Sequence, residues 1–150
     1  MAKMNRGFIT ACALACACLA SSVSAHSVRA TMDAAGNTAT FTGLARVTCF
    51  DDGSGPAAML TARIRDNSPA VAGLLVNLQL VRGGAAISIS DAISGDENYS
   101  DYVALPGGNG EYIMMVNKTA AGARSFDLEW HCVTGGSVHT GTDVTVQQFQ

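Results

Sequence analysis

The sequence predicts an all-β protein, built as a two-sheet antiparallel sandwich. Three observations predict this fold class: short segments alternate apolar and polar residues, glycine-rich turns separate them at regular spacing, and helix signals are nearly absent. The connections are too short to hold the crossovers that parallel strands need. We therefore expect a Greek-key arrangement, immunoglobulin-like or jelly-roll.

The first 25 residues have the composition of a secretory signal peptide. Lys3 and Arg6 form a positively charged start, residues 8–20 are apolar, and a small-residue cleavage site ends at Ala25. The apolar stretch is too short to span a membrane, and no later stretch is long enough. Cleavage after Ala25 would make His26 the first residue of a periplasmic or secreted protein.

The remaining chain, residues 26–150, has the size of one sandwich domain with a single core. The full sequence has 9 basic and 12 acidic residues; two basic residues leave with the signal peptide, so 9 − 2 = 7 remain and the net charge is −5. This acidic balance, without a basic patch, excludes nucleic acid and anionic membranes as expected partners.

Cysteine usage predicts one disulfide. Three of the five cysteines lie in the predicted signal peptide, which leaves Cys49 and Cys132. A single remaining pair in an exported chain indicates a bond formed in an oxidising compartment. This bond would close a segment of 132 − 49 = 83 residues, and we expect it to join the two sheets.

The first three predicted strands alternate clearly. Residues 28–32 end at the turn Ala35-Gly36-Asn37. Residues 38–50 follow, with Gly43 as an expected bulge and with an inward set of Phe41, Ala45, Val47 and Cys49. Residues 59–66 follow a loop that contains Pro56, and their inward set is Leu60, Ala62 and Ile64.

The middle strands are shorter and their turns are stronger. Residues 74–82 follow a break at Pro69 and place Val76, Leu78 and Leu80 inward. The pair Gly83-Gly84 predicts a tight turn into residues 85–90. Residues 102–105 form a short strand, and a glycine-rich turn after Pro106 leads into residues 111–118.

The strand of residues 124–133 defines the sandwich best, because its two faces differ most. Phe126, Leu128, Trp130 and Cys132 share the predicted inner face, whereas Asp127, Glu129 and His131 share the face expected to meet solvent. Trp130 near a disulfide cysteine resembles the arrangement of immunoglobulin-like domains. The last strand, residues 142–149, is expected to turn Val144 and Val146 inward.

Residues 74–132 also carry a set of short motifs. These are Asn77-Leu78-Gln79-Leu80, an acidic loop, Gly108-Asn109-Gly110-Glu111-Tyr112-Ile113 and Gly122-Ala123-Arg124-Ser125-Phe126. In these motifs the segment resembles bacterial pre-peptidase C-terminal domains, which are secreted β-sandwiches with a Gly-x-Tyr strand. The resemblance implies a non-catalytic accessory or binding role.

Three histidines form the predicted metal site. As the first residue after cleavage, His26 would offer its α-amine and a ring nitrogen to one ion, a chelate that suits Cu(II). Copper proteins with an N-terminal histidine provide the analogy. His131, or His139 in the following loop, would supply the remaining nitrogen. The alternative is that both are ordinary surface histidines.

The loop of residues 91–100 is acidic, and Asp91, Asp96 and Glu97 are its candidate calcium ligands. Oxygen-rich loops suit calcium. The alternative is ordinary turn chemistry, because aspartate stabilises turns through its own hydrogen bonds.

We therefore expect an exported protein that binds a ligand without transforming it, with copper as the first candidate. The alternative is a structural or adhesive module, calcium-dependent, that contacts an extracytoplasmic protein or glycan through loops or sheet edges. The sequence after residue 25 has no Gly-x-Ser-x-Gly elbow, His-Glu-x-x-His helix or phosphate loop. An enzyme is not expected, and an oxidative copper enzyme ranks third. The cofactor itself stays unknown.

Overall fold

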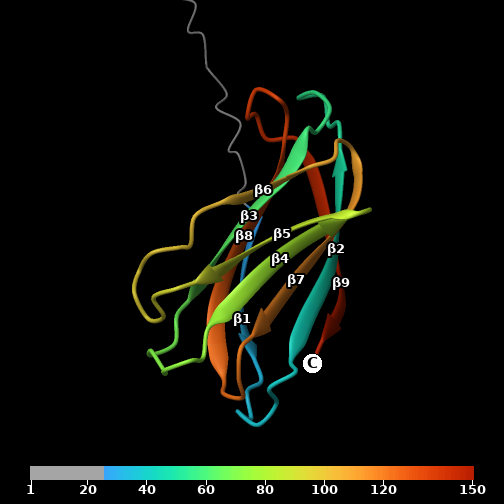
Figure 1. Ribbon diagram of the computed structural model, residues 1–150. Helices are drawn as coiled ribbons and strands as arrows, with labels where there is room; N and C mark the ends of the chain where they lie inside the picture. Colours follow the sequence, from blue (N-terminus) through green and yellow to red (C-terminus); the bar gives the residue numbers. More distant parts are fainter. Residues whose placement is uncertain (1–25) are drawn as a thin grey trace, which may run out of the picture.

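The computed structural model describes residues 26–150, and it arranges them as nine strands (Figure 1). The predicted signal peptide lies outside the described residues. The strands are β1 (His26–Met32), β2 (Thr42–Phe50), β3 (Met59–Asp66), β4 (Val76–Arg82), β5 (Ala85–Asp91), β6 (Val103–Pro106), β7 (Gly110–Lys118), β8 (Arg124–Val133) and β9 (Gly141–Phe149). Their bounds lie close to the predicted ones, except that β2 begins later than residue 38.

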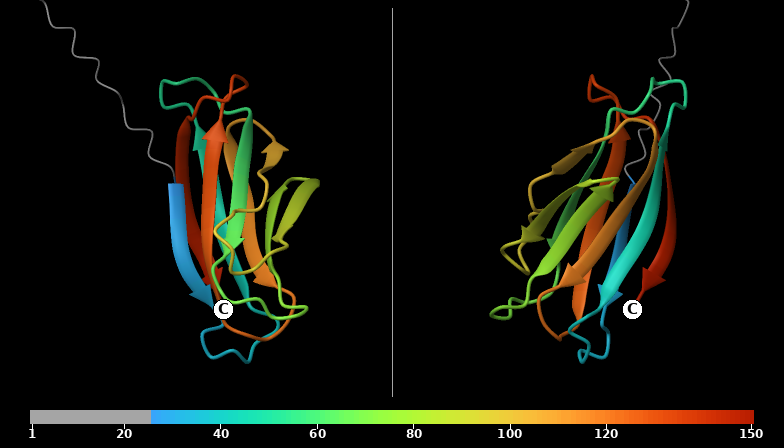
Figure 2. Two further views of the ribbon diagram at one scale, coloured as in Figure 1. Left: turned by 90° about the vertical axis from the view of Figure 1, so that its left-hand side faces the viewer. Right: turned by 45° about the vertical axis from the view of Figure 1, so that its right-hand side comes forward.

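The strands form two antiparallel sheets that face each other (Figure 2). One sheet has four strands in the order β1-β8-β3-β6, and the other has five in the order β5-β4-β7-β2-β9. Every connection crosses between the sheets except the β4–β5 hairpin, which turns at the predicted Gly83-Gly84 pair. The predicted antiparallel sandwich is confirmed. Within residues 26–150, no helix is long and apolar enough to cross a membrane.

The core lies between the sheets, and alternation within each strand builds it. Phe126, Leu128, Trp130 and Cys132 of β8 are all buried, as predicted. On β3 every second residue is buried, starting at Leu60. Burial of each large apolar side chain contributes about 1.5–3 kcal/mol, so these inner faces hold the two layers together.

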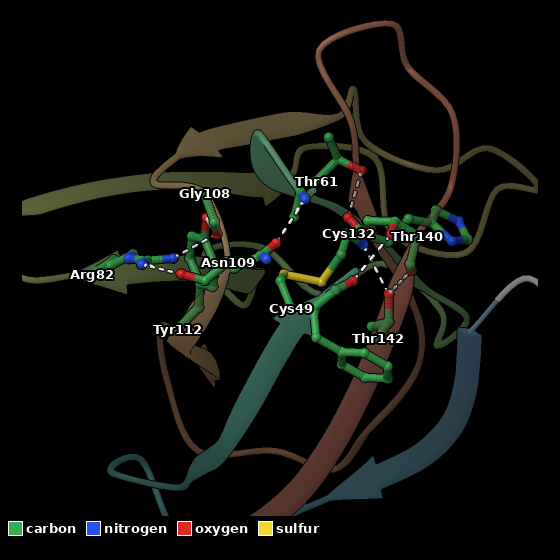
Figure 3. Close-up of a disulfide and its surroundings, with 12 residues drawn as sticks. Cys49, Thr61, Arg82, Gly108, Asn109, Tyr112, Cys132, Thr140 and Thr142 are labelled. Carbon is green, nitrogen blue, oxygen red and sulfur yellow. Dashed lines mark hydrogen bonds between the residues drawn. A yellow bond between two sulfur atoms is a disulfide. The ribbon is translucent and has the colours of Figure 1, made fainter. Parts of the chain in front are cut away.

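The predicted disulfide is confirmed, and it joins the two sheets (Figure 3). Cys49 lies on β2 and Cys132 on β8, with their Cα atoms 5.5 Å apart. Two threonines, one in the β8–β9 loop and one in β9, hydrogen-bond to the backbone of Cys132. Its N–H donates to Thr142 Oγ1 at 3.1 Å, and its carbonyl accepts from the Thr140 N–H at 3.0 Å. The bond therefore lies in a well-packed end of the sandwich.

A buried ion pair fixes the opposite end of the molecule. Lys118 Nζ donates to Asp33 Oδ2 at 2.7 Å, to the Thr38 carbonyl at 2.6 Å and to the Ala120 carbonyl at 2.8 Å. All three ammonium donors thus have partners, as a buried charge requires. The hydrogen bond from Lys118 holds the pKa of Asp33 well below its usual range.

The strand β9 departs from its prediction. Val144 is partly buried and packs against the core, but Val146, expected to be buried, is 67% exposed. The irregularity expected at Gly43 lies between Leu44 and Ala45, where the β2–β9 register shifts. The physical reason is that β9 is an edge strand, so Val146 has a neighbouring strand on one side only.

Candidate functional site

Strands β1 and β9 are the edge strands on the same side of the sandwich (Figure 2). Side chains of these strands and of β2, β7 and β8 line an apolar cleft between them. Its volume is about 360 Å³. Pockets for small ligands commonly have volumes of roughly 300–1,000 Å³. We call this feature the edge cleft. It is large enough to be a binding site.

Buried side chains form the floor of the edge cleft, and exposed apolar side chains form its rim. The floor contains Met114, Val116, Phe126, Leu128 and Trp130, all of them members of the core. The rim contains Val28, Val146 and Phe149, which are 43%, 67% and 43% exposed. The core of this protein is thus open to solvent on one side.

Small residues at inward positions create the hollow. Ala30 pairs with Phe126 across β1 and β8, and Ala45 lies in one row with Met114 and Val146 across β7, β2 and β9. An alanine at such a position leaves space that a larger residue would fill. Both alanines line the edge cleft. Alanine at an inward position is visible in the sequence, but it does not show by itself that the strand lies beside an open edge.

One end of the edge cleft is closed by aromatic packing. Phe149 meets Phe41 edge to face, with ring centroids 5.0 Å apart. Gly43 permits this approach, because a Cβ there would lie 2.7 Å from Val116 and 3.0 Å from the Phe149 ring. The other end lies at Trp130, whose ring centroid is 6.2 Å from that of His26.

Both strands beside the edge cleft have a free edge. Within the described chain, β1 pairs with β8 alone and β9 pairs with β2 alone. Their arrowheads lie at the same end of the molecule, so they run in the same direction (Figure 1). By contrast, the edge strand β6 has four residues and ends in Pro106, which are features that protect an edge from pairing.

The edge cleft carries no charge. Of the residues in the described chain that line it, none is charged, and the polar side-chain groups are the Gln148 amide and the Trp130 indole N–H. A charged ligand group inside it would lose its hydration without a partner, at high cost.

The outer face of β8 differs from its prediction, because two of its three polar residues are buried. Asp127 is 6% and His131 is 5% exposed. Arg29 reaches over from β1 and binds Asp127 with two hydrogen bonds of 2.6 and 2.9 Å, and Arg65 of β3 binds the same carboxylate. Alternation separated the two faces correctly, but it could not show that long arginines cover the outer one.

Glu129 lies in the middle of this outer face. Arg63 donates to its Oε2 at 2.8 Å, Tyr102 donates to its Oε1, and Nε2 of His131 lies 3.1 Å from the same Oε1. Burial alone would raise the pKa of Glu129, but these hydrogen bonds lower it to about 2. Burial and the bond to Glu129 raise the pKa of Tyr102 to about 12. This cluster is a closed network of ion pairs.

The structure brings two of the three predicted metal ligands together. The rings of His131 and His139 stack, with centroids 4.1 Å apart and planes at 17°. His26 pairs with Trp130 across β1 and β8, so its side chain lies on the inner face, opposite to His131. Burial lowers the pKa of His131, the bond to Glu129 opposes this shift, and His139 and His26 add to it.

The three candidate calcium ligands of the acidic loop each bind a different partner within the protein. Asp91 is buried, and its two oxygens accept hydrogen bonds from the backbone N–H groups of Asp66 and Ile93 at 2.6 and 3.1 Å. Asp96 binds Asn98, and Glu97 binds Arg65 through its backbone carbonyl. Among residues 26–150, no three His, Cys, Asp or Glu side chains are arranged to hold a metal ion.

Comparison with known proteins adds no relative: no family model, curated protein or solved structure matches the chain. The resemblance of residues 74–132 to pre-peptidase C-terminal domains therefore stays a prediction.

Proposed function

We propose that this protein is an exported, non-catalytic binding protein that holds an elongated apolar ligand in the edge cleft. One observation carries the proposal: an uncharged hollow of about 360 Å³ opens the core to solvent between β1 and β9. Apolar surface in contact with water disfavours the empty state by roughly 25 cal/mol per Å². A ligand that covers the floor and the exposed valines of the rim would remove this cost.

The shape of the edge cleft supports an elongated ligand. Its floor follows β8 from Phe126 to Trp130, which is about 14 Å at the usual rise per strand residue. The carboxylates of β8, Asp127 and Glu129, lie on the opposite face of the sheet and bind Arg29 and Arg63, so they would not take part in binding at the edge cleft.

Filling the hollow tests the proposal. Ala45→Phe places a ring in the row that Ala45 shares with Met114 and Val146. The matched control is Thr145→Phe, which adds the same bulk to the exposed outer face of β9. An apolar fluorescent probe should bind the parent protein and the control saturably, and Ala45→Phe should weaken binding at least tenfold. Equal binding by all three proteins would contradict the proposal.

A second candidate is a metal ion, copper first, held by His131 and His139. The observation that favours it is that Nδ1 of His131 is buried without a hydrogen-bond partner in the described chain, beside a second imidazole. A ligand nitrogen points to its metal in the plane of its ring, so the stacked His139 ring would have to turn. His26, on the inner face, would need to reach around the edge of β1.

Electron paramagnetic resonance with one equivalent of Cu(II) tests this candidate. Binding through the histidines should give a nitrogen-rich signal that His139→Gln weakens, and an extra residue ahead of a mature His26 shows whether the α-amine takes part. A signal no stronger than that of a denatured control would exclude the copper site.

A further inference from the structure

We infer that the occupant of the edge cleft is a single extended strand of a partner protein, inserted between β1 and β9 and antiparallel to both. This inference rests on the proposed function, because it names the ligand of the same site. It makes the protein a strand-accepting module.

The backbone of the two edge strands carries the argument. Each strand presents N–H and C=O groups that have no partner strand on the cleft side within residues 26–150. Since β1 and β9 run in the same direction (Figure 1), one inserted strand can be antiparallel to both of them. Such a strand would donate and accept on both of its edges, and it would join the two sheets on this side.

An acyl chain fits the same volume but not the same chemistry. It would cover the cleft without giving the edge groups of β1 and β9 any partner, and an unpaired backbone group shielded from water is costly. The backbone N–H and C=O groups at the free edges of β1 and β9 therefore favour a polypeptide ligand. Recognition by strand addition uses this combination, with backbone bonds for affinity and pockets for alternate side chains.

The lining of the edge cleft specifies the side chains of the partner. Because no lining residue in the described part is charged, the inward side chains of the inserted strand must be uncharged and apolar. A floor of about 14 Å accommodates about five residues, of which three point inward. The hollows at Ala30 and Ala45 fit branched aliphatic side chains, while the outward residues of the strand face solvent and can be polar.

A synthetic peptide tests this inference. The probe is a peptide of about nine residues that alternates leucine with threonine, the length of an ordinary strand. Two controls accompany it: a peptide of the same composition with its leucines adjacent, and the alternating peptide with two N-methylated backbone nitrogens. Loss of two hydrogen bonds should weaken binding roughly thirtyfold. Binding is measured by calorimetry on the whole protein.

Amide hydrogen exchange identifies the mode of binding. The alternating peptide should slow exchange at amides of both β1 and β9, and Ala45→Phe should abolish this protection. Equal affinity of the N-methylated peptide, or protection of one edge strand alone, would overturn the inference. If the apolar probe binds the edge cleft and no peptide does, the proposed function stands and this inference fails. If neither binds, both fail.

Self-association of the protein without any peptide also tests which chain supplies the inserted strand. If the protein alone forms dimers at high concentration that protect the same amides, the strand comes from a second copy, and the inference of a different partner protein is overturned.

Discussion

Removal of the disulfide should destabilise the protein strongly, and the structure gives the magnitude. Cys49 and Cys132 are buried and lie on facing sheets, 83 residues apart. On the chain-entropy model, a cross-link that closes a loop of this length stabilises the folded state by about 4.5 kcal/mol, because it restricts the unfolded chain. The perturbation is the double substitution Cys49→Ala/Cys132→Ala.

Urea unfolding measures this loss. Trp130 is the single tryptophan and is 5% exposed, so its fluorescence reports the opening of the core. For a domain of this size the unfolding midpoint should fall by roughly 2 M urea. The parent protein in reductant should unfold at the same midpoint as the double variant. If the free energy of unfolding of the double variant lies within about 1 kcal/mol of that of the oxidised parent, the disulfide does not stabilise the protein by restricting the unfolded chain.

Three further predictions concern pH and packing. The pKa of Glu129 is lowered from 4.5 to about 2, so its contribution to stability is present above pH 4.5 and is lost as the pH falls toward 2; Glu129→Gln should flatten this part of a plot of urea midpoint against pH. The ring of His131 should titrate below pH 6.5 in the folded protein, because burial disfavours its charged form; an NMR midpoint above 6.5 would contradict the buried position. Gly122→Ala should lower the free energy of unfolding in urea by about 1–3 kcal/mol, because Gly122 has φ of +139° and a Cβ there would lie 2.4 Å from Leu74. Gly135→Ala is the neutral control, because a Cβ at Gly135 would meet no atom within 4 Å.

The fold could be predicted from the sequence because the alternation of apolar and polar residues indicates which side chains of a strand are buried. In β8 the period of two separates Phe126, Leu128 and Trp130 from Asp127 and Glu129, and all three apolar residues are buried. The pairing of Cys49 with Cys132 followed by elimination. These inferences need only the local pattern and the count of cysteines.

The site could not be predicted, because it depends on which strands end up at the edges. Nothing in the local pattern of Ala30 or Ala45 shows that β1 and β9 lie on the same side of the sandwich without pairing. The burial of His131 likewise depends on side chains outside the local pattern of β8: its ring stacks on His139, and it shares the Glu129 carboxylate with Tyr102. Alternation assigns a residue to a face, but the covering of that face is a tertiary property.

The position of ligand-induced NMR shifts tests the central claim most directly. With the alternating peptide or an apolar probe added to the whole protein, we predict that the largest shifts occur at Ala30, Ala45 and Val146, which line the edge cleft. Shifts centred on His131, on the outer face of β8, and on His139, in the β8–β9 loop, or an unchanged spectrum would contradict the account.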